Sequence, residues 1–97
     1  MVRAEAISRL TEHADALRAL GVTGLHLFGS TATGDSRPGS DLDLLIDHGP
    51  GKFSLFDLVG IKLFLEDELS VETDVVTRAG LHPALRDAIE RSAVKIF

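Results

Sequence analysis

The chain has 97 residues, enough for one domain and too few for two, so we expect a single domain over residues 1–97. It contains no cysteine, which excludes disulfides, thiolate metal sites and thiol catalysis. Ten basic and fifteen acidic residues give a net charge of −5, which argues against a protein that coats nucleic acid. The apolar runs are too short for a membrane span and the N-terminus does not resemble a secretory signal, so we expect a cytoplasmic protein without a membrane partner.

Hydrophobic periodicity predicts a helix followed by two strands in the first half of the chain. Apolar residues spaced by three and four predict the helix over Arg3–Leu20, and Gly21 suits its end. Short buried strands are predicted at Val22–Phe28 and Asp41–Asp47. The segment between them, residues 29–40, is rich in Gly, Ser and Thr and is predicted to be a loop.

The next helix is predicted from a capping signal. Ser54 and Asp57, three residues apart, form an approximate capping box at its start. Apolar residues almost encircle this helix, which predicts deep burial or a protein contact. A third strand is predicted at Val71–Val76.

The C-terminal segment adds a last helix and a short tail. Pro83 suits a first helical turn, with Leu85 and Ile89 facing inward. The tail, Ala93–Phe97, is predicted either to fray or to add a short edge strand. The order of elements predicts an α/β or α+β fold with a small mixed β-sheet flanked by helices.

Two carboxylates are expected to share one face of the second strand. Side chains at positions i and i+2 of a strand point the same way, so Asp41 and Asp43 have Cα atoms roughly 6–7 Å apart. Carboxylates that close repel each other unless a cation lies between them. Hard divalent ions such as Mg²⁺ prefer oxygen ligands and accept phosphate as a further ligand. Two such ions would stabilise the attacking and leaving oxygens of a phosphoryl displacement.

Gly29 and Ser30 directly follow the first strand and suit phosphate binding. Glycine allows the backbone to approach a phosphate closely, and Ser30 offers its amide and its hydroxyl, especially if a helical turn begins there. The loop through residues 31–40 would return the chain so that Asp41 and Asp43 lie beside Ser30.

Asp74 on the third strand is the expected third carboxylate. If this strand pairs with the Asp41 strand, Asp74 joins the cluster as a metal ligand and as the general base for an attacking hydroxyl. Glu72 shares its face and is the rival for this role. Three carboxylates beside a phosphate-binding turn indicate metal-assisted nucleotidyl transfer.

Gly29-Ser30, ten intervening residues, Asp41-x-Asp43 and the later Asp74 together resemble the polymerase-β-type nucleotidyltransferase signature. The short chain resembles the minimal nucleotidyltransferases, the MNT antitoxins of HEPN/MNT toxin–antitoxin pairs. This resemblance implies a polymerase-β-like core and transfer of AMP from ATP, with Mg²⁺, to a partner HEPN ribonuclease, which is thereby silenced. It implies Ser30 as a phosphate contact, Asp41 and Asp43 as metal ligands, and Asp74 as the third catalytic carboxylate.

One position departs from the family pattern. The family commonly has Ala-Arg-Gly after Gly-Ser, whereas here Thr33 stands in the arginine's place and Arg37 is the candidate substitute. This departure supports an alternative, an antitoxin that neutralises its partner by binding alone. A third reading, adenylylation of tRNA, is disfavoured by the acidic charge balance. The small size favours an acceptor presented by another chain.

Overall fold

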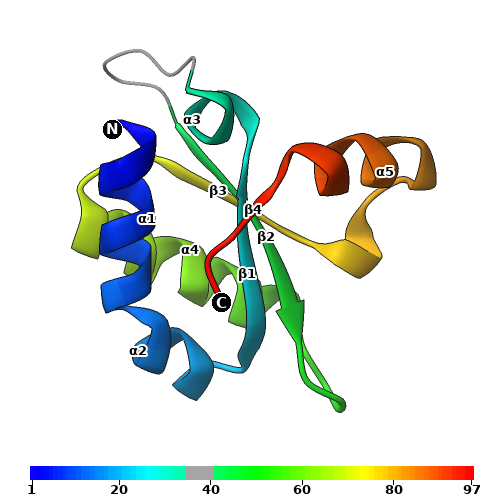
Figure 1. Ribbon diagram of the computed structural model, residues 1–97. Coiled ribbons are helices and arrows are strands. Elements are labelled where there is room, and N and C mark those ends of the chain that lie inside the picture. The colour runs from blue at the N-terminus through cyan, green and yellow to red at the C-terminus, as the bar shows by residue number, and fades with distance from the viewer. Residues whose placement is uncertain (35–40) are drawn as a thin grey trace.

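A four-stranded mixed sheet lies at the centre of the structure, a computed structural model that describes residues 1–34 and 41–97 (Figure 1). The strand order is β3-β2-β1-β4. β2 runs antiparallel to β1 and parallel to β3, and β4 adds an antiparallel edge to β1. The strands are β1 (Val22–Phe28), β2 (Leu42–His48), β3 (Thr73–Thr77) and β4 (Val94–Lys95). The expected mixed α/β fold is confirmed.

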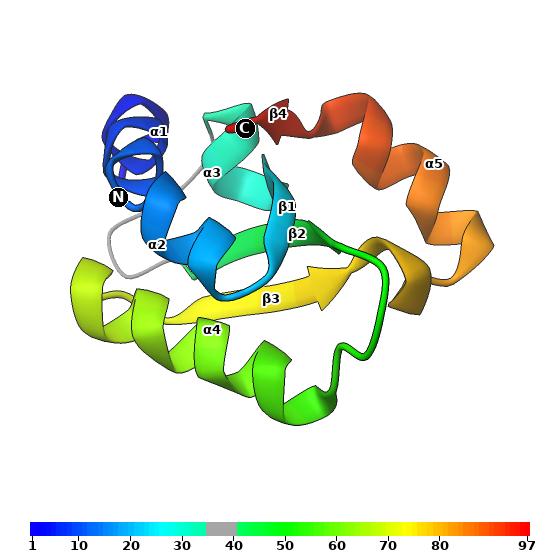
Figure 2. The ribbon, with the colours of Figure 1, turned by 90° about the horizontal axis from the view of Figure 1, so that it is seen from below.

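Helices lie on both faces of this sheet (Figures 1 and 2). One face carries α1, α2 and α4, and the other carries α5, while α3 lies at the end of β1. None of the described helices is long and apolar enough to cross a membrane. The helical segments are α1 (Arg3–Glu12), α2 (Ala14–Ala19), α3 (Gly29–Thr33), α4 (Leu55–Leu69), the 3₁₀ turn η1 (Arg78–Gly80) and α5 (Pro83–Ser92).

The hydrophobic core fills the space between the sheet and the three helices α1, α2 and α4. Leu25 and Leu27 of β1 lie beside Ile46 and Leu44 of β2 in register, and all four side chains are fully buried. Burying one such side chain contributes about 1.5–3 kcal/mol. The same cluster includes helix residues with almost no exposed surface: Ala6, Leu10, Leu17, Ile61, Leu65 and Leu69.

The N-terminal helix is two helices, so the prediction of one continuous helix over Arg3–Leu20 is wrong. The break falls at His13, whose backbone leaves the helical region at φ −97° and ψ 8°. Its ring lies 2.8 Å from the Arg9 carbonyl through Nδ1 and 3.3 Å from Glu68 Oε2 of α4 through Nε2. The ring also packs edge-on against Phe64. These contacts tie the break to α4 and account for it better than helix propensity does.

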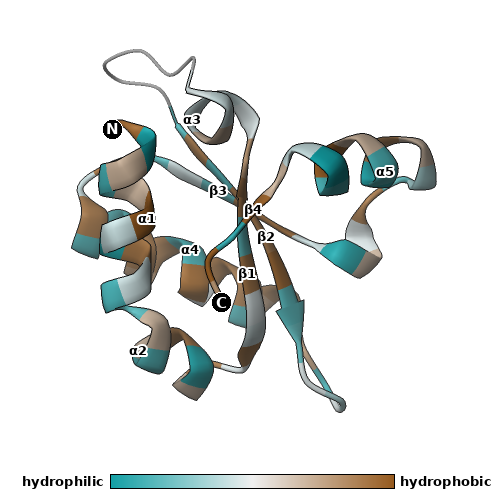
Figure 3. Cartoon of the chain, in the orientation of Figure 1, coloured by the Kyte–Doolittle hydropathy of each residue, from teal (hydrophilic) through white to brown (hydrophobic). Residues whose placement is uncertain are grey.

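Helix α4 begins as predicted but is only half buried. Ser54 and Asp57 form the full capping box, with the Asp57 amide 3.2 Å from Ser54 Oγ and the Ser54 amide 2.8 Å from Asp57 Oδ2. Figure 3 colours much of this helix as hydrophobic. Its outer face nevertheless exposes Leu55 (73%), Phe56 (89%), Val59 (42%) and Leu63 (58%). The expected deep burial is therefore wrong for this face.

Helix α5 departs further from the sequence pattern. It begins with Pro83 as predicted, yet Leu85 is 57% exposed instead of facing inward, and the helix has no fully buried residue. Ile89 is half buried. The tail forms the predicted edge strand, since Val94 and Lys95 pair with Leu27 and His26 of β1.

Candidate active site

Three neighbouring strands bring the predicted site residues to one end of the sheet. Phe28, the last residue of β1, pairs with Asp43 on β2, and Asp43 pairs with Asp74 on β3. Gly29 follows Phe28 directly, so the glycine and two carboxylates lie side by side across the sheet. Glu72, the rival to Asp74, precedes β3, and its carbonyl accepts a hydrogen bond from the Leu42 amide at 2.9 Å. The register thus places Asp74 beside Asp43 and Glu72 two residues away.

Gly29 is required by its backbone conformation and by its contact with Asp43. Its φ is +75°, in the left-handed region that favours glycine. A Cβ at this position would overlap Asp43 Oδ2 and lie 3.1 Å from Asp43 Cγ. The carboxylate of Asp43 therefore lies directly against the backbone of Gly29, which joins the Gly-Ser turn to the Asp-x-Asp strand.

Ser30 lies in the first turn of α3, a short helix where the sequence predicted a loop. Residues 29–33 leave β1 and turn at once into this helix, which contacts both β1 and β2. The Thr33 hydroxyl donates to the Ser30 carbonyl at 3.1 Å and closes the turn. The structure thus places Ser30 next to Gly29, at the same end of the sheet as Asp43.

Asp43 is the electrostatic centre of the site. Burial raises its pKa above the ordinary value of 3.8, and the neighbouring carboxylates of Asp74 and then Asp41 raise it further. Asp41 lies directly before β2 and is exposed, as is Asp74, whereas Asp43 is half buried. Asp74 and Asp41 therefore both act on Asp43.

The carboxylates of the described residues do not form a complete metal site by themselves. Within residues 1–34 and 41–97, no group of three or more Asp, Glu, His or Cys side chains converges closely enough to hold a metal ion by itself. Mg²⁺ in phosphoryl-transfer sites is commonly held by one or two carboxylates together with substrate phosphates and water. The carboxylate oxygens of Asp43 and Asp74, on paired positions of neighbouring strands, fit that incomplete arrangement. Arg37, the candidate replacement for the missing arginine, lies outside the described residues.

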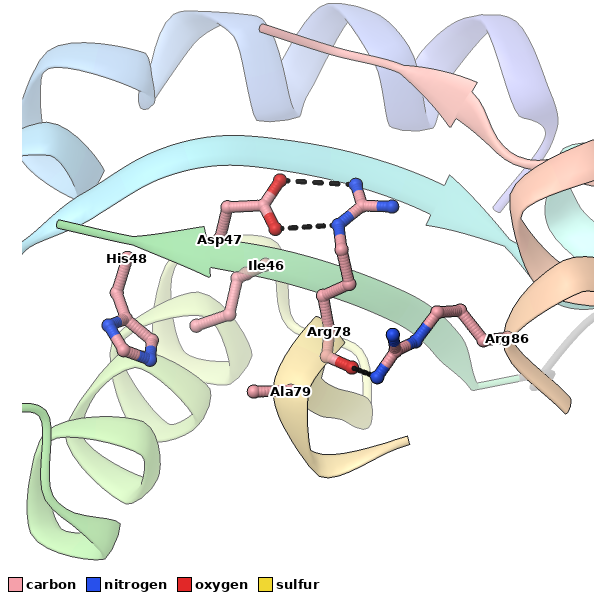
Figure 4. A pocket seen from close by; sticks show the side chains of 6 residues that line it. All are labelled: Ile46, Asp47, His48, Arg78, Ala79 and Arg86. Carbon is pink, nitrogen blue, oxygen red and sulfur yellow. Dashed lines mark hydrogen bonds and ion pairs between the residues drawn. The ribbon is translucent and has the colours of Figure 1, made fainter. Parts of the chain in front are cut away.

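A second charged cluster lies at the opposite end of β2, where sequence analysis identified no site (Figure 4). Arg78 donates to both oxygens of Asp47, at 2.8 and 3.1 Å, and also pairs with Glu90. His26 Nε2 lies 3.5 Å from Asp47 Oδ2. A pocket of about 360 Å³ lies beside this cluster, lined by Ile46, Asp47, His48, Arg78, Ala79 and Arg86.

This second cluster is a structural tie, because its charges neutralise one another. Bonding to Arg78 lowers the pKa of Asp47, and bonding to Asp47 and Glu90 raises the pKa of Arg78. Arg86 of α5 donates to the Arg78 carbonyl at 3.2 Å. The network therefore joins η1 and α5 to the sheet. The sequence gives no signal that Asp47 pairs with Arg78, because the two residues lie 31 positions apart.

Comparisons of the sequence and the structure with known proteins identify the family of this chain. The sequence model described as "Nucleotidyltransferase domain" matches residues 10–96. The chain is 43% identical over 77 residues to "Putative protein adenylyltransferase MJ0435" of Methanocaldococcus jannaschii, covering 79% of this chain and 82% of the relative. A solved chain described as a "putative minimal nucleotidyltransferase" superposes with a TM-score of 0.84 and 35% identity, over 97% of this chain and 95% of that chain.

Two more distant structures share the fold. One is a toxin–antitoxin complex with AMP-PNP, with a TM-score of 0.76 and 17% identity over 87% of this chain and 68% of that chain. The other is a tri-AMPylated Shewanella oneidensis HEPN toxin in complex with an MNT antitoxin, with a TM-score of 0.66 and 15% identity over 91% of this chain and 70% of that chain. With the family match over nearly the whole sequence and a relative at 43% identity, the chain belongs to the nucleotidyltransferase domain family.

Proposed function

We propose that this protein is an adenylyltransferase antitoxin, which transfers AMP from ATP to a hydroxyl group of a partner HEPN toxin. The observation that carries the proposal is the register Phe28–Asp43–Asp74, which gathers the Gly-Ser turn and two acidic strands at one end of the sheet. The relative at 43% identity is named a protein adenylyltransferase, and one structural neighbour is an MNT antitoxin bound to an AMPylated HEPN toxin.

The site residues divide the chemistry between them. Gly29 and Ser30 would receive the outer phosphates of ATP, since Gly29 carries no side chain and Ser30 lies in the helical turn that follows β1. Asp41, Asp43 and Asp74 would hold one or two Mg²⁺ ions only together with the substrate phosphates and water, and the ions would neutralise charge on the phosphates. The pKa of Asp43, raised by burial and then by Asp74 and Asp41, supports this role, because a bound cation would stabilise its charged form.

In the transfer step, the oxygen of the acceptor hydroxyl attacks the α-phosphorus of ATP. The bond between the α-phosphorus and the bridging oxygen to the β-phosphate breaks, and pyrophosphate leaves with that electron pair. Asp74, exposed beside Asp43, would accept the hydroxyl proton. The products are the AMP ester of the acceptor and pyrophosphate.

The outer face of α4 is the surface that we assign to the partner protein. Leu55, Phe56, Val59 and Leu63 are uncharged and exposed, and together they present on the order of 500 Å² of apolar side chain. A standard protein interface needs about 800 Å² from each partner, so this face supplies more than half of one side. The acceptor chain of the proposed reaction is the occupant to which we commit.

The alternative is an antitoxin that neutralises the toxin by binding alone. Thr33 favours it, because this residue lies where the family commonly has arginine and its hydroxyl is turned back onto the Ser30 carbonyl. The same α4 face would serve such a protein equally well.

Intact-mass analysis of the co-expressed partner separates the two functions. After incubation with ATP and Mg²⁺, the partner should gain whole AMP units, and Asp43→Asn should prevent the gain while complex formation persists. Neutralisation of the toxin without any mass gain, in both the wild-type protein and Asp43→Asn, would establish the binding-only alternative.

A further inference from the structure

Asp74 lies on an edge of the sheet, because among the described strands β3 has β2 as its one neighbour. In a parallel pair, alternate residues direct their backbone groups toward the neighbouring strand, and the residues between them direct theirs outward. The hydrogen bond from the Leu42 amide to the Glu72 carbonyl sets Glu72 and Asp74 toward β2. Thr73, between them, therefore directs its amide and its carbonyl away from the sheet.

An ion pair on α4, which runs along β3 in Figure 2, binds both of these outward groups. Glu66 Oε2 accepts a hydrogen bond from the Thr73 amide at 3.0 Å, and Lys62 Nζ donates to the Thr73 carbonyl at 3.0 Å. Lys62 Nζ also donates to Glu66 Oε2 at 2.7 Å, one helical turn away. The pair thus closes the sheet edge at the residue before Asp74, as a further strand would.

We infer that Lys62 and Glu66 are positioning residues for Asp74. The inference rests on the proposed function, in which Asp74 receives the acceptor proton. β2 holds Glu72 from inside the sheet while the α4 pair holds Thr73 from outside, so the backbone from which the Asp74 carboxylate projects is fixed on both sides.

Charge supports the same role. Glu66 raises the pKa of Lys62 most strongly, and the carboxylates of Asp74 and Glu72 raise it as well, so the ammonium group lies within electrostatic reach of the site. The pKa of Glu66 is lowered by Lys62 and by the Thr73 amide. Both groups are therefore charged at neutral pH, and the ammonium partly offsets the acidic cluster.

Two substitutions at one position separate the hydrogen bond from the charge. Glu66→Met removes the acceptor for the Thr73 amide, and kcat for AMP transfer should fall about tenfold or more. KM for ATP should stay within about twofold, because Gly29 and Ser30 lie on another segment. Glu66→Gln keeps a carbonyl oxygen as acceptor and should retain kcat within about threefold of wild type. Wild-type kcat in Glu66→Met, or equal losses in both variants, would overturn the inference.

Amide hydrogen exchange gives a readout that does not need activity. Glu66→Met should speed exchange of the Thr73 amide about tenfold or more, while the Leu25 amide, bonded to the Phe97 carbonyl at 3.1 Å, should exchange as in wild type. Asp15→Asn, which breaks an exposed ion pair with Arg18, is the control and should change neither kcat nor Thr73 exchange. Unchanged Thr73 exchange in Glu66→Met would refute the positioning role of Lys62 and Glu66 even if kcat falls. A wild-type protein that transfers no AMP would refute the proposed function, and the catalytic role of the pair with it, whatever the exchange shows.

Discussion

Substitution of Gly29 by alanine tests the geometry of the site most directly. The glycine has φ +75°, and forcing an L-residue into the left-handed region costs about 1–2 kcal/mol. The new Cβ would also overlap Asp43 Oδ2, so the carboxylate must turn away from the Gly-Ser turn. A domain stable by about 5–15 kcal/mol survives the backbone cost, so the variant should remain folded.

Gly51→Ala is the matched control for backbone strain. Gly51 has φ +106°, and a Cβ there would have no atom within 4 Å. Both variants should therefore lose about 1–2 kcal/mol of unfolding free energy in urea titrations, with any excess for Gly29→Ala reporting the contact with Asp43. Only Gly29→Ala should also lose AMP transfer, by about 100-fold, because a metal ligand or phosphate contact displaced by about 1 Å has a cost of this size.

The assay for activity is the AMP mass gain of the partner per unit time at saturating ATP. Equal transfer rates in Gly29→Ala and Gly51→Ala would refute the reasoning, since the Asp43 carboxylate would then have no functional contact with the turn. A Gly29→Ala protein that unfolds at much lower urea than its control would instead place the main role of this contact in stability.

Asp43→Asn should raise the free energy of unfolding at neutral pH while abolishing transfer, because the raised pKa of Asp43 means that its charged form opposes folding; a lower urea midpoint would contradict this. The pKa of Asp47 is lowered by Arg78, so its contribution is present above the unfolded-state pKa and is lost as pH falls through the folded value. Asp47→Asn should therefore flatten the loss of stability below about pH 4, measured by urea titration at several pH values; an unchanged slope would exclude the pair as its source. Leu63→Asp should change the free energy of unfolding by about 0.5 kcal/mol or less, because Leu63 is exposed. It should weaken partner binding about tenfold in calorimetric titration. Unaltered affinity would exclude the α4 face as the docking surface.

The sequence predicted the elements that local chemistry specifies. The strand at Val22–Phe28 has the predicted bounds, and α4 begins at the predicted capping box. In both cases a short-range pattern, either buried apolar residues or two side chains three positions apart, determines the outcome. The adjacency of Asp43 and Asp74 was predicted only on condition that their strands pair, and the structure supplies that pairing.

Elements that depend on distant partners were predicted less well. The helix break at His13 depends on Glu68, 55 residues away, and periodicity over residues 3–20 carries no trace of it. Leu85 was predicted to face inward because it occupies an apolar position of α5, yet it is exposed, and polar contacts of Glu90 and Arg86 join α5 to Arg78. Apolar spacing therefore predicted the helix and not the face that it buries.

The two ends of β2 show how a carboxylate that serves structure differs from one that serves a ligand. Asp43 and Asp47 lie four residues apart on the same strand and so point to the same face of the sheet. Arg78 neutralises Asp47 with two hydrogen bonds, and its pKa is lowered. The pKa of Asp43 is instead raised, by burial and then by its acidic neighbours Asp74 and Asp41. Because a half-buried carboxylate beside like charges has an unfavourable free energy without a cation, the proposed metal would bind at Asp43 and not at Asp47.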